Sequence, residues 1–139
     1  MPRLVSSLNL ADARRMISAG ERKASELKIP YNIAVVDAGG GLVAQVRMDG
    51  AWLGCVAIAL DKAWTARAFD APTEELALMT QSGQPGFGLN TTNGSRVVIF
   101  GGGIPIEVDG AVIGAVGASG GSVEDDIQVA RAAVAGFPG

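Results

Sequence analysis

Histidine is absent from this sequence of 139 residues, and cysteine occurs once, as Cys55. Histidine is the usual general base near neutral pH and the commonest zinc ligand, so its absence excludes those sites in their usual form. A lone cysteine forms no disulfide within the chain and no cysteine cluster for a metal. We therefore expect no metal site.

Charge is also scarce, because Asp, Glu, Lys and Arg together make up 18% of the residues while hydrophobic residues make up 48%. The 11 basic residues are scattered and the net charge is −3, which argues against nucleic-acid binding. So few charges on a monomer would leave large apolar patches exposed. We therefore expect a homo-oligomer.

Long hydrophobic runs are missing as well. No segment approaches the roughly 20 apolar residues that a transmembrane helix needs, so we expect no membrane contact. The first residues, Met1 to Ser6, lack the apolar region and cleavage site of a signal peptide. These two absences predict a cytoplasmic protein.

Local patterns predict four helices. A capping residue starts the first helix, small residues dominate the second, Pro72 begins the third, and a capping box opens the last. We expect them over residues 10–29, 51–69, 72–81 and 123–135, with a Gly-, Pro- and Asn-rich loop over 82–95.

Short β-branched runs predict about five strands. Gly39–Gly41 and the Asp109-Gly110 pair mark two hairpin turns. The strands are expected over residues 33–36, 42–48, 96–100, 104–108 and 111–116. No strand–helix–strand unit repeats, so the pattern predicts one α+β domain over residues 1–139, with a mainly antiparallel sheet and helices on its faces.

Charged side chains cluster around the first hairpin and the helix after it. Asp37 ends the first strand, Arg47 lies near the end of its partner, and Asp49 precedes the helix that carries Lys62 and Arg67. If that helix packs over the hairpin, these groups converge on one concavity, where a cation holds a carboxylate and Asp49 or Lys62 moves a proton. The same residue types also suit a turn, a helix start and a solvated surface, so both interpretations stay open.

An ordered set of short motifs resembles the GlcG/HbpS-like family, which also includes the C-terminal domain of PduO-type proteins. The resemblance extends from about Leu8 to Ala135. It rests on Arg47-Met48-Asp49-Gly50-Ala51, Lys62-Ala63 with Thr65-Ala66, Pro85–Gly88, Gly102–Ile106, Asp109-Gly110, Gly114–Gly120 and Glu124-Asp125-Asp126.

This resemblance implies a profilin-like layered domain, a homo-oligomer and, for several members, binding of haem or association with corrinoids. Without histidine, a haem iron would need another ligand or none. The candidate ligands are Tyr31, Met48, Cys55, Lys62 and Met79. The natural partners of the haem propionates are Arg47, Lys62 and Arg67, because charge-assisted hydrogen bonds to carboxylates are strong.

Three functions are therefore open. The first is binding of haem or another tetrapyrrole, with a ligand site drawn from Tyr31, Asp37, Arg47, Met48, Lys62 and Arg67. The second is a cofactor-free lyase, hydratase or isomerase in a catabolic pathway, in which Arg47 holds a small carboxylated metabolite and Lys62 or Asp49 moves the proton. The third is an oligomeric accessory protein or scaffold without a site. The family precedent favours the first.

Overall fold

The computed structural model describes all residues, 1–139, and contains one four-stranded sheet. Its strands run in the order β2-β1-β4-β3, and every neighbouring pair is antiparallel. The elements are α1 (Leu10–Leu27), β1 (Asn32–Asp37), β2 (Leu42–Arg47), α2 (Gly54–Phe69), α3 (Thr73–Met79), β3 (Gly103–Val108), β4 (Ala111–Ser119) and α4 (Val123–Ala135).

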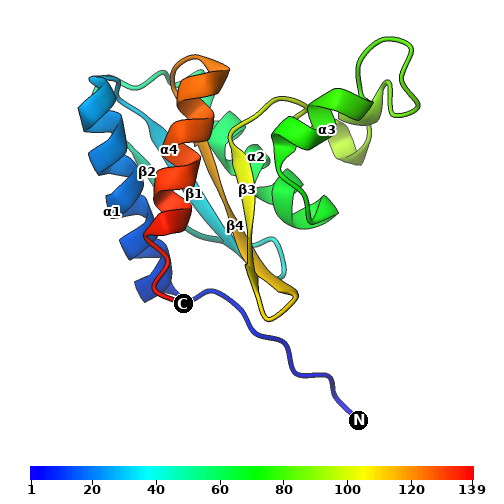
Figure 1. Ribbon diagram of the computed structural model, residues 1–139, viewed down its shortest axis with the longest axis horizontal. Coiled ribbons are helices and arrows are strands. Elements are labelled where there is room, and N and C mark those ends of the chain that lie inside the picture. Colours follow the sequence, from blue (N-terminus) through cyan, green and yellow to red (C-terminus); the bar gives the residue numbers. More distant parts are fainter.

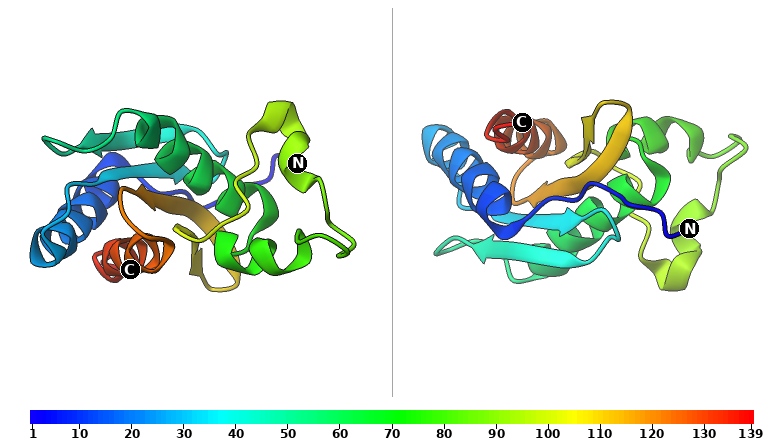
Figure 2. Two further views of the ribbon diagram at one scale, coloured as in Figure 1. Left: turned by 90° about the horizontal axis from the view of Figure 1, so that it is seen from above. Right: turned by 90° about the horizontal axis from the view of Figure 1, so that it is seen from below.

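Helices cover both faces of the sheet (Figures 1 and 2). On one face, α1 and α4 enclose the larger core, which includes Met16, Ile33 and Val116. On the other face, α2 lies on β1 and β4 over a smaller core built from Val36, Ala63, Ala66 and Ala115. The expected α+β class with an antiparallel sheet is confirmed.

The small residues of α2 let that helix approach the sheet very closely. Gly117 of β4 faces α2, and a Cβ atom built there would collide with the backbone of Ala59. Ala59, Ala63 and Ala66 of the helix are fully buried. Close approach therefore depends on glycine in the strand and alanine in the helix.

Turn and cap residues act as the sequence predicts. The Asn9 side chain accepts a hydrogen bond from the Asp12 N–H at the start of α1, and Ser122 does the same for Asp125 at the start of α4. Asp109 and Gly110 have φ values of 50° and 78°, which matches the tight turn between β3 and β4.

The prediction of about five strands is wrong, because residues 96–100 pair with no strand. This segment lies against α2 instead, where the Val98 N–H donates to Thr65 Oγ1 at 3.1 Å. A side-chain hydroxyl thus replaces a ladder partner, while Val97 is still buried like a strand residue. The helix predicted from residue 51 begins later, at Gly54. None of the helices has the length and apolar character that a membrane span requires.

Candidate functional site

Lys62, in the middle of α2, is fully buried, with 0% of its surface exposed. Its Nζ donates to Asp126 Oδ2 at 2.6 Å and to the Ala118 carbonyl oxygen at 2.9 Å. The Phe100 ring covers the ammonium group, with 4.8 Å from Nζ to the ring centroid. Protein groups therefore surround the charge, as a buried ion requires.

Asp126, in the first turn of α4, is the acceptor that organises this cluster. Its Oδ1 accepts from the Tyr31 hydroxyl at 2.8 Å and from the backbone N–H groups of Gly120 and Gly121 at 3.2 and 3.1 Å. One carboxylate thus joins the residue before β1, helix α2 and the turn between β4 and α4. We call Tyr31, Lys62 and Asp126 the buried triad.

Burial perturbs two members of the buried triad. Desolvation, together with the hydrogen bond to Asp126, raises the pKa of Tyr31 far above its usual range. Desolvation also lowers the pKa of Lys62, and the neighbouring Asp126 carboxylate opposes that shift. At neutral pH, Tyr31 is a neutral donor whose proton is committed to Asp126.

Arg47, Met48 and Asp49 lie at the opposite end of the first hairpin from Asp37. Arg47 pairs with Asn32 at the start of β1, whereas Asp37 ends that strand, so about 16 Å of extended chain separates the two positions. The Arg47 Nε donates to the Ala51 carbonyl oxygen at 3.3 Å, and Met48 Sδ accepts from the Tyr31 N–H at 3.4 Å. Asp49 is exposed.

The predicted single concavity is therefore not formed. Lys62 and Tyr31 meet through Asp126 inside the protein, while Asp49 lies on the surface. Lys62 is buried and Asp49 is exposed, so the two side chains do not share a site in which a proton could pass between them. Asp126 is identified from the sequence only as part of a family motif and not as a site residue. The recurrence of Asp126, Val129, Ala130 and Ala133 at the spacing of one helix face places that carboxylate on the buried side.

Asp37 and Arg67 lie near each other at the end of the sheet that carries both hairpin turns. Asp37 Oδ1 accepts from the N–H groups of Gly39 and Gly41, at 3.0 Å each. In the last turn of α2, the Arg67 Nε donates to the Ala38 carbonyl oxygen at 2.6 Å. Arg67 Nη1 pairs with Asp70 at 2.6 Å. These two contacts use Nε and Nη1, so the two N–H donors of Nη2 remain for a ligand.

A hollow of about 900 Å³ lies beside Arg67, and we call it the arm groove. The chain before α1 passes under the hairpin turns (Figures 1 and 2). Its residues 3–6 line the hollow and so form one wall. The lining residues are Arg3, Leu4, Val5, Ser6, Ala38, Gly39, Arg67, Asp70, Glu107, Gly110, Ala111 and Val112.

Two hydrogen bonds anchor the arm that forms this wall. The Ala38 N–H donates to Ser7 Oγ at 3.0 Å, and the Leu8 N–H donates to the Ile113 carbonyl oxygen at 2.9 Å. Leu8 is buried, but Leu4 beyond it is 94% exposed. The arm therefore presents unpartnered apolar side chains next to the arginines of the groove.

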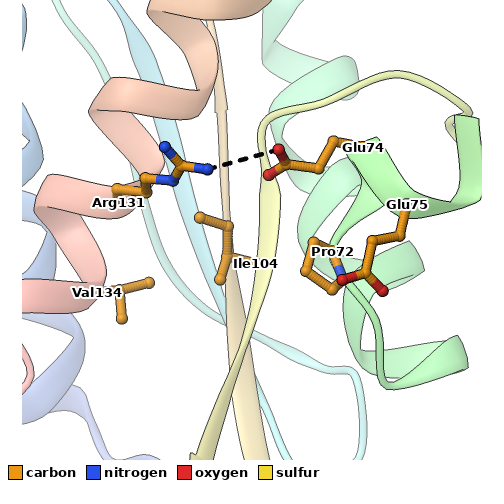
Figure 3. Close-up of a pocket in the computed structure, with 6 residues that line it drawn as sticks. All are labelled: Pro72, Glu74, Glu75, Ile104, Arg131 and Val134. Atoms are coloured by element: carbon orange, nitrogen blue, oxygen red, sulfur yellow. Dashed lines mark ion pairs between the residues drawn. The ribbon is translucent and has the colours of Figure 1, made fainter.

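A second, smaller hollow of about 300 Å³ lies between α3 and α4 (Figure 3). Arg131 and Glu74 face each other across it at 3.6 Å, above an apolar floor that includes Ile104. None of the predicted site residues lines it. It is the less suitable of the two for a large planar ligand, because its volume is at the lower limit of known ligand pockets.

The family resemblance implies haem, so the residues must be tested against that group. The arm groove has the volume of a ligand pocket, apolar walls and two arginines suited to propionates. The predicted iron ligands fit poorly: Tyr31, Cys55 and Lys62 are buried, and Met48 Sδ already accepts a hydrogen bond. Met79 is exposed on α3 but is not part of the groove lining. The groove is therefore compatible in size and charge with a dicarboxylic macrocycle, whereas the predicted set offers it no axial ligand.

These features define a small α+β protein with a partly apolar groove and a buried ion pair. Residues 8–135 match the family described as haem degrading protein HbpS-like, and the chain belongs to this family. The resemblance inferred from the ordered motifs is thereby confirmed.

Three curated relatives extend this result. An uncharacterized 15.0 kDa protein of the dhaT–dhaS intergenic region of Citrobacter freundii is 43% identical over 130 residues, covering 94% of this chain and 92% of the relative. Protein GlcG of Escherichia coli is 35% identical, covering 84% of this chain and 83% of its own length. The corrinoid adenosyltransferase PduO of Salmonella typhimurium is 38% identical over 93% of this chain, which corresponds to only 38% of PduO.

Solved structures agree with the fold. Protein ORFY of Klebsiella pneumoniae superposes with a TM-score of 0.96 at 41% identity, covering 98% of this chain and 94% of the other. A PduOC–haem complex superposes with a TM-score of 0.91 at 37% identity, and the match covers 96% of both chains. HbpS superposes with a TM-score of 0.87 at 30% identity, and the match covers 97% of this chain and 92% of HbpS.

Proposed function

We propose that this protein binds haem or a related tetrapyrrole and that the arm groove is the site. The observation that carries the proposal is the likeness to a haem complex: the PduOC–haem structure matches at 37% identity over 96% of both chains. Membership of the HbpS-like family supports the same ligand class.

The groove offers what a dicarboxylic tetrapyrrole needs. Its volume of about 900 Å³ lies near the top of the range for small-molecule sites. Leu4, Val5 and Val112 supply apolar surface for the macrocycle, and the free Nη2 of Arg67 supplies a charge-assisted donor for a propionate. Arg3 lies on the same lining and is a second cationic partner.

Arg67 is the most informative residue to change, because the structure already holds its guanidinium in place. Its bonds to Ala38 and Asp70 fix the group before any ligand arrives, so little side-chain entropy is lost on binding. A hydrogen bond to a charged group contributes about 1.5–3 kcal/mol, so Arg67→Ala should weaken binding by roughly tenfold or more.

An absorbance titration with hemin tests the proposal. The unchanged protein should give a saturating, stoichiometric Soret shift that an unrelated acidic protein does not give. Arg67→Ala should require more hemin for saturation, while Arg131→Ala, at the smaller hollow, should match the unchanged protein. A titration identical to that of the unrelated protein would refute haem binding by this chain.

A further inference from the structure

The arm groove lacks every side chain that commonly binds haem iron. Its twelve lining residues include no histidine, cysteine, methionine, tyrosine or lysine. Asp70 and Glu107 are the only side chains of the lining with an anionic oxygen, and Asp70 is already paired with Arg67 at 2.6 Å. The usual haem ligands are the imidazole of histidine, the thiolate of cysteine, the thioether of methionine and the phenolate of tyrosine.

No member of the buried triad can replace the missing ligand without opening the core. The Tyr31 hydroxyl is committed to Asp126, and Lys62 Nζ is held by Asp126 and Ala118 on a fully buried side chain. Withdrawing Lys62 would leave the Asp126 carboxylate buried without its cation, which costs several kcal/mol. The core therefore opposes iron ligation by these groups.

We infer that the protein recognises the porphyrin macrocycle and its carboxylates and not the metal at its centre, so that metal-free and metallated dicarboxylic porphyrins bind alike. This inference rests on the proposed function. The apolar walls contact the macrocycle faces, and the arginines contact the propionates, which are the same in both ligands. Because no side chain of the groove forms a strong bond to the metal, removing the metal removes no protein contact.

A change at Glu107 distinguishes this inference from the alternative that Glu107 is itself a ligand of the iron. Its side chain is exposed on β3 and lines the groove, so its negative charge opposes the two propionates that all these ligands carry. If the metal is not recognised, Glu107→Gln should tighten both ligands by the same factor. If Glu107 is an oxygen ligand of the iron, the same change should weaken hemin alone.

The experiment compares hemin, zinc protoporphyrin and metal-free protoporphyrin IX in equilibrium titrations of the full chain. Quenching of the fluorescence of the two tryptophans measures the binding of all three ligands by the same signal. The dissociation constants should lie within about tenfold of one another, a difference of no more than about 1.4 kcal/mol. Glu107→Gln should lower all three dissociation constants by a common factor, and the change keeps the size of an exposed side chain.

Each contrary result has a distinct meaning. A preference for hemin over metal-free porphyrin of roughly a hundredfold would overturn the inference but keep the proposed function. A loss of hemin binding in Glu107→Gln with unchanged porphyrin binding would overturn it in the same way. Failure of all three ligands to bind would refute the proposed function itself.

Discussion

Lys62 and Asp126 form a 2.6 Å ion pair that joins the helical layer on one face of the sheet to the layer on the other. Lys62 belongs to α2 and Asp126 to α4, and their side chains are 0% and 4% exposed. Gly102 makes room for the contact: its φ is +123°, and a Cβ atom there would lie 2.7 Å from Lys62 Nζ. The pair therefore depends on a glycine beside the start of β3.

Breaking this pair should destabilise the fold strongly. In Lys62→Met, the Asp126 carboxylate stays buried with no cation, and removal of one partner of a buried pair costs about 3–5 kcal/mol. Urea unfolding followed by circular dichroism should show this loss as a lower midpoint.

Lys23→Met is the matched control. Lys23 is partly exposed and pairs with Glu26 at 3.5 Å on the surface of α1, so its loss should cost less than about 1 kcal/mol. Equal stability of the two variants would show that the buried ion pair is not a structural requirement.

The chain has a single tyrosine, so its ionisation can be followed directly at 295 nm. Burial and the bond to Asp126 raise the pKa of Tyr31, so the folded protein should show no phenolate signal as pH passes about 10. The protein in guanidinium should titrate near that value.

The same shift predicts a pH-dependent stability. Above pH 10 the unfolded chain releases the tyrosine proton and the folded chain keeps it, so stability should fall by up to about 1.4 kcal/mol per pH unit. Below that pH, both states hold the proton and Tyr31 contributes no slope. A phenolate signal near pH 10 in a still-folded protein would contradict the burial of this hydroxyl.

Gly117→Ala tests the close approach of α2 to β4. The new methyl group would meet the Ala59 backbone, which cannot move without shifting the helix, so the expected loss is about 3 kcal/mol. Thermal unfolding measures it. Gly54→Ala is the control, because nothing lies within 4 Å of its added Cβ at the start of α2, and it should be neutral or slightly stabilising. Similar midpoints for both variants would argue against tight helix–sheet packing.

Local rules predicted most of the fold. The Asn9 cap, the glycine turn after β1 and the Asp109-Gly110 turn each determine a boundary through nearby atoms alone. The segment 96–100 is not a strand because the Val98 N–H bonds to the hydroxyl of Thr65 in α2, a residue distant in sequence, and not to a neighbouring strand. Such a partner has no signature in a local pattern.

The site was predicted only in part, for a similar reason. Arg67 and Asp37 lie near one end of the sheet and Arg47 at the other, because the β1–β2 register places Arg47 opposite Asn32. The role of Lys62 depends on Asp126, which is 64 residues away in the chain. The arm groove depends on how the chain before α1 crosses the hairpin turns, and no residue pattern there predicts that path. The expected homo-oligomer and the profilin-like label stay predictions.

Hydrogen exchange followed by mass spectrometry, with and without protoporphyrin IX, tests most directly whether the arm groove is the binding site. Binding should slow exchange in three separate segments: the arm at residues 3–7, the turn at 38–41 and the hairpin at 109–112. Segments 48–53 and 74–79 lie outside the groove lining and should exchange as before. Protection confined to those two segments, with the three groove segments unchanged, would contradict the proposed site.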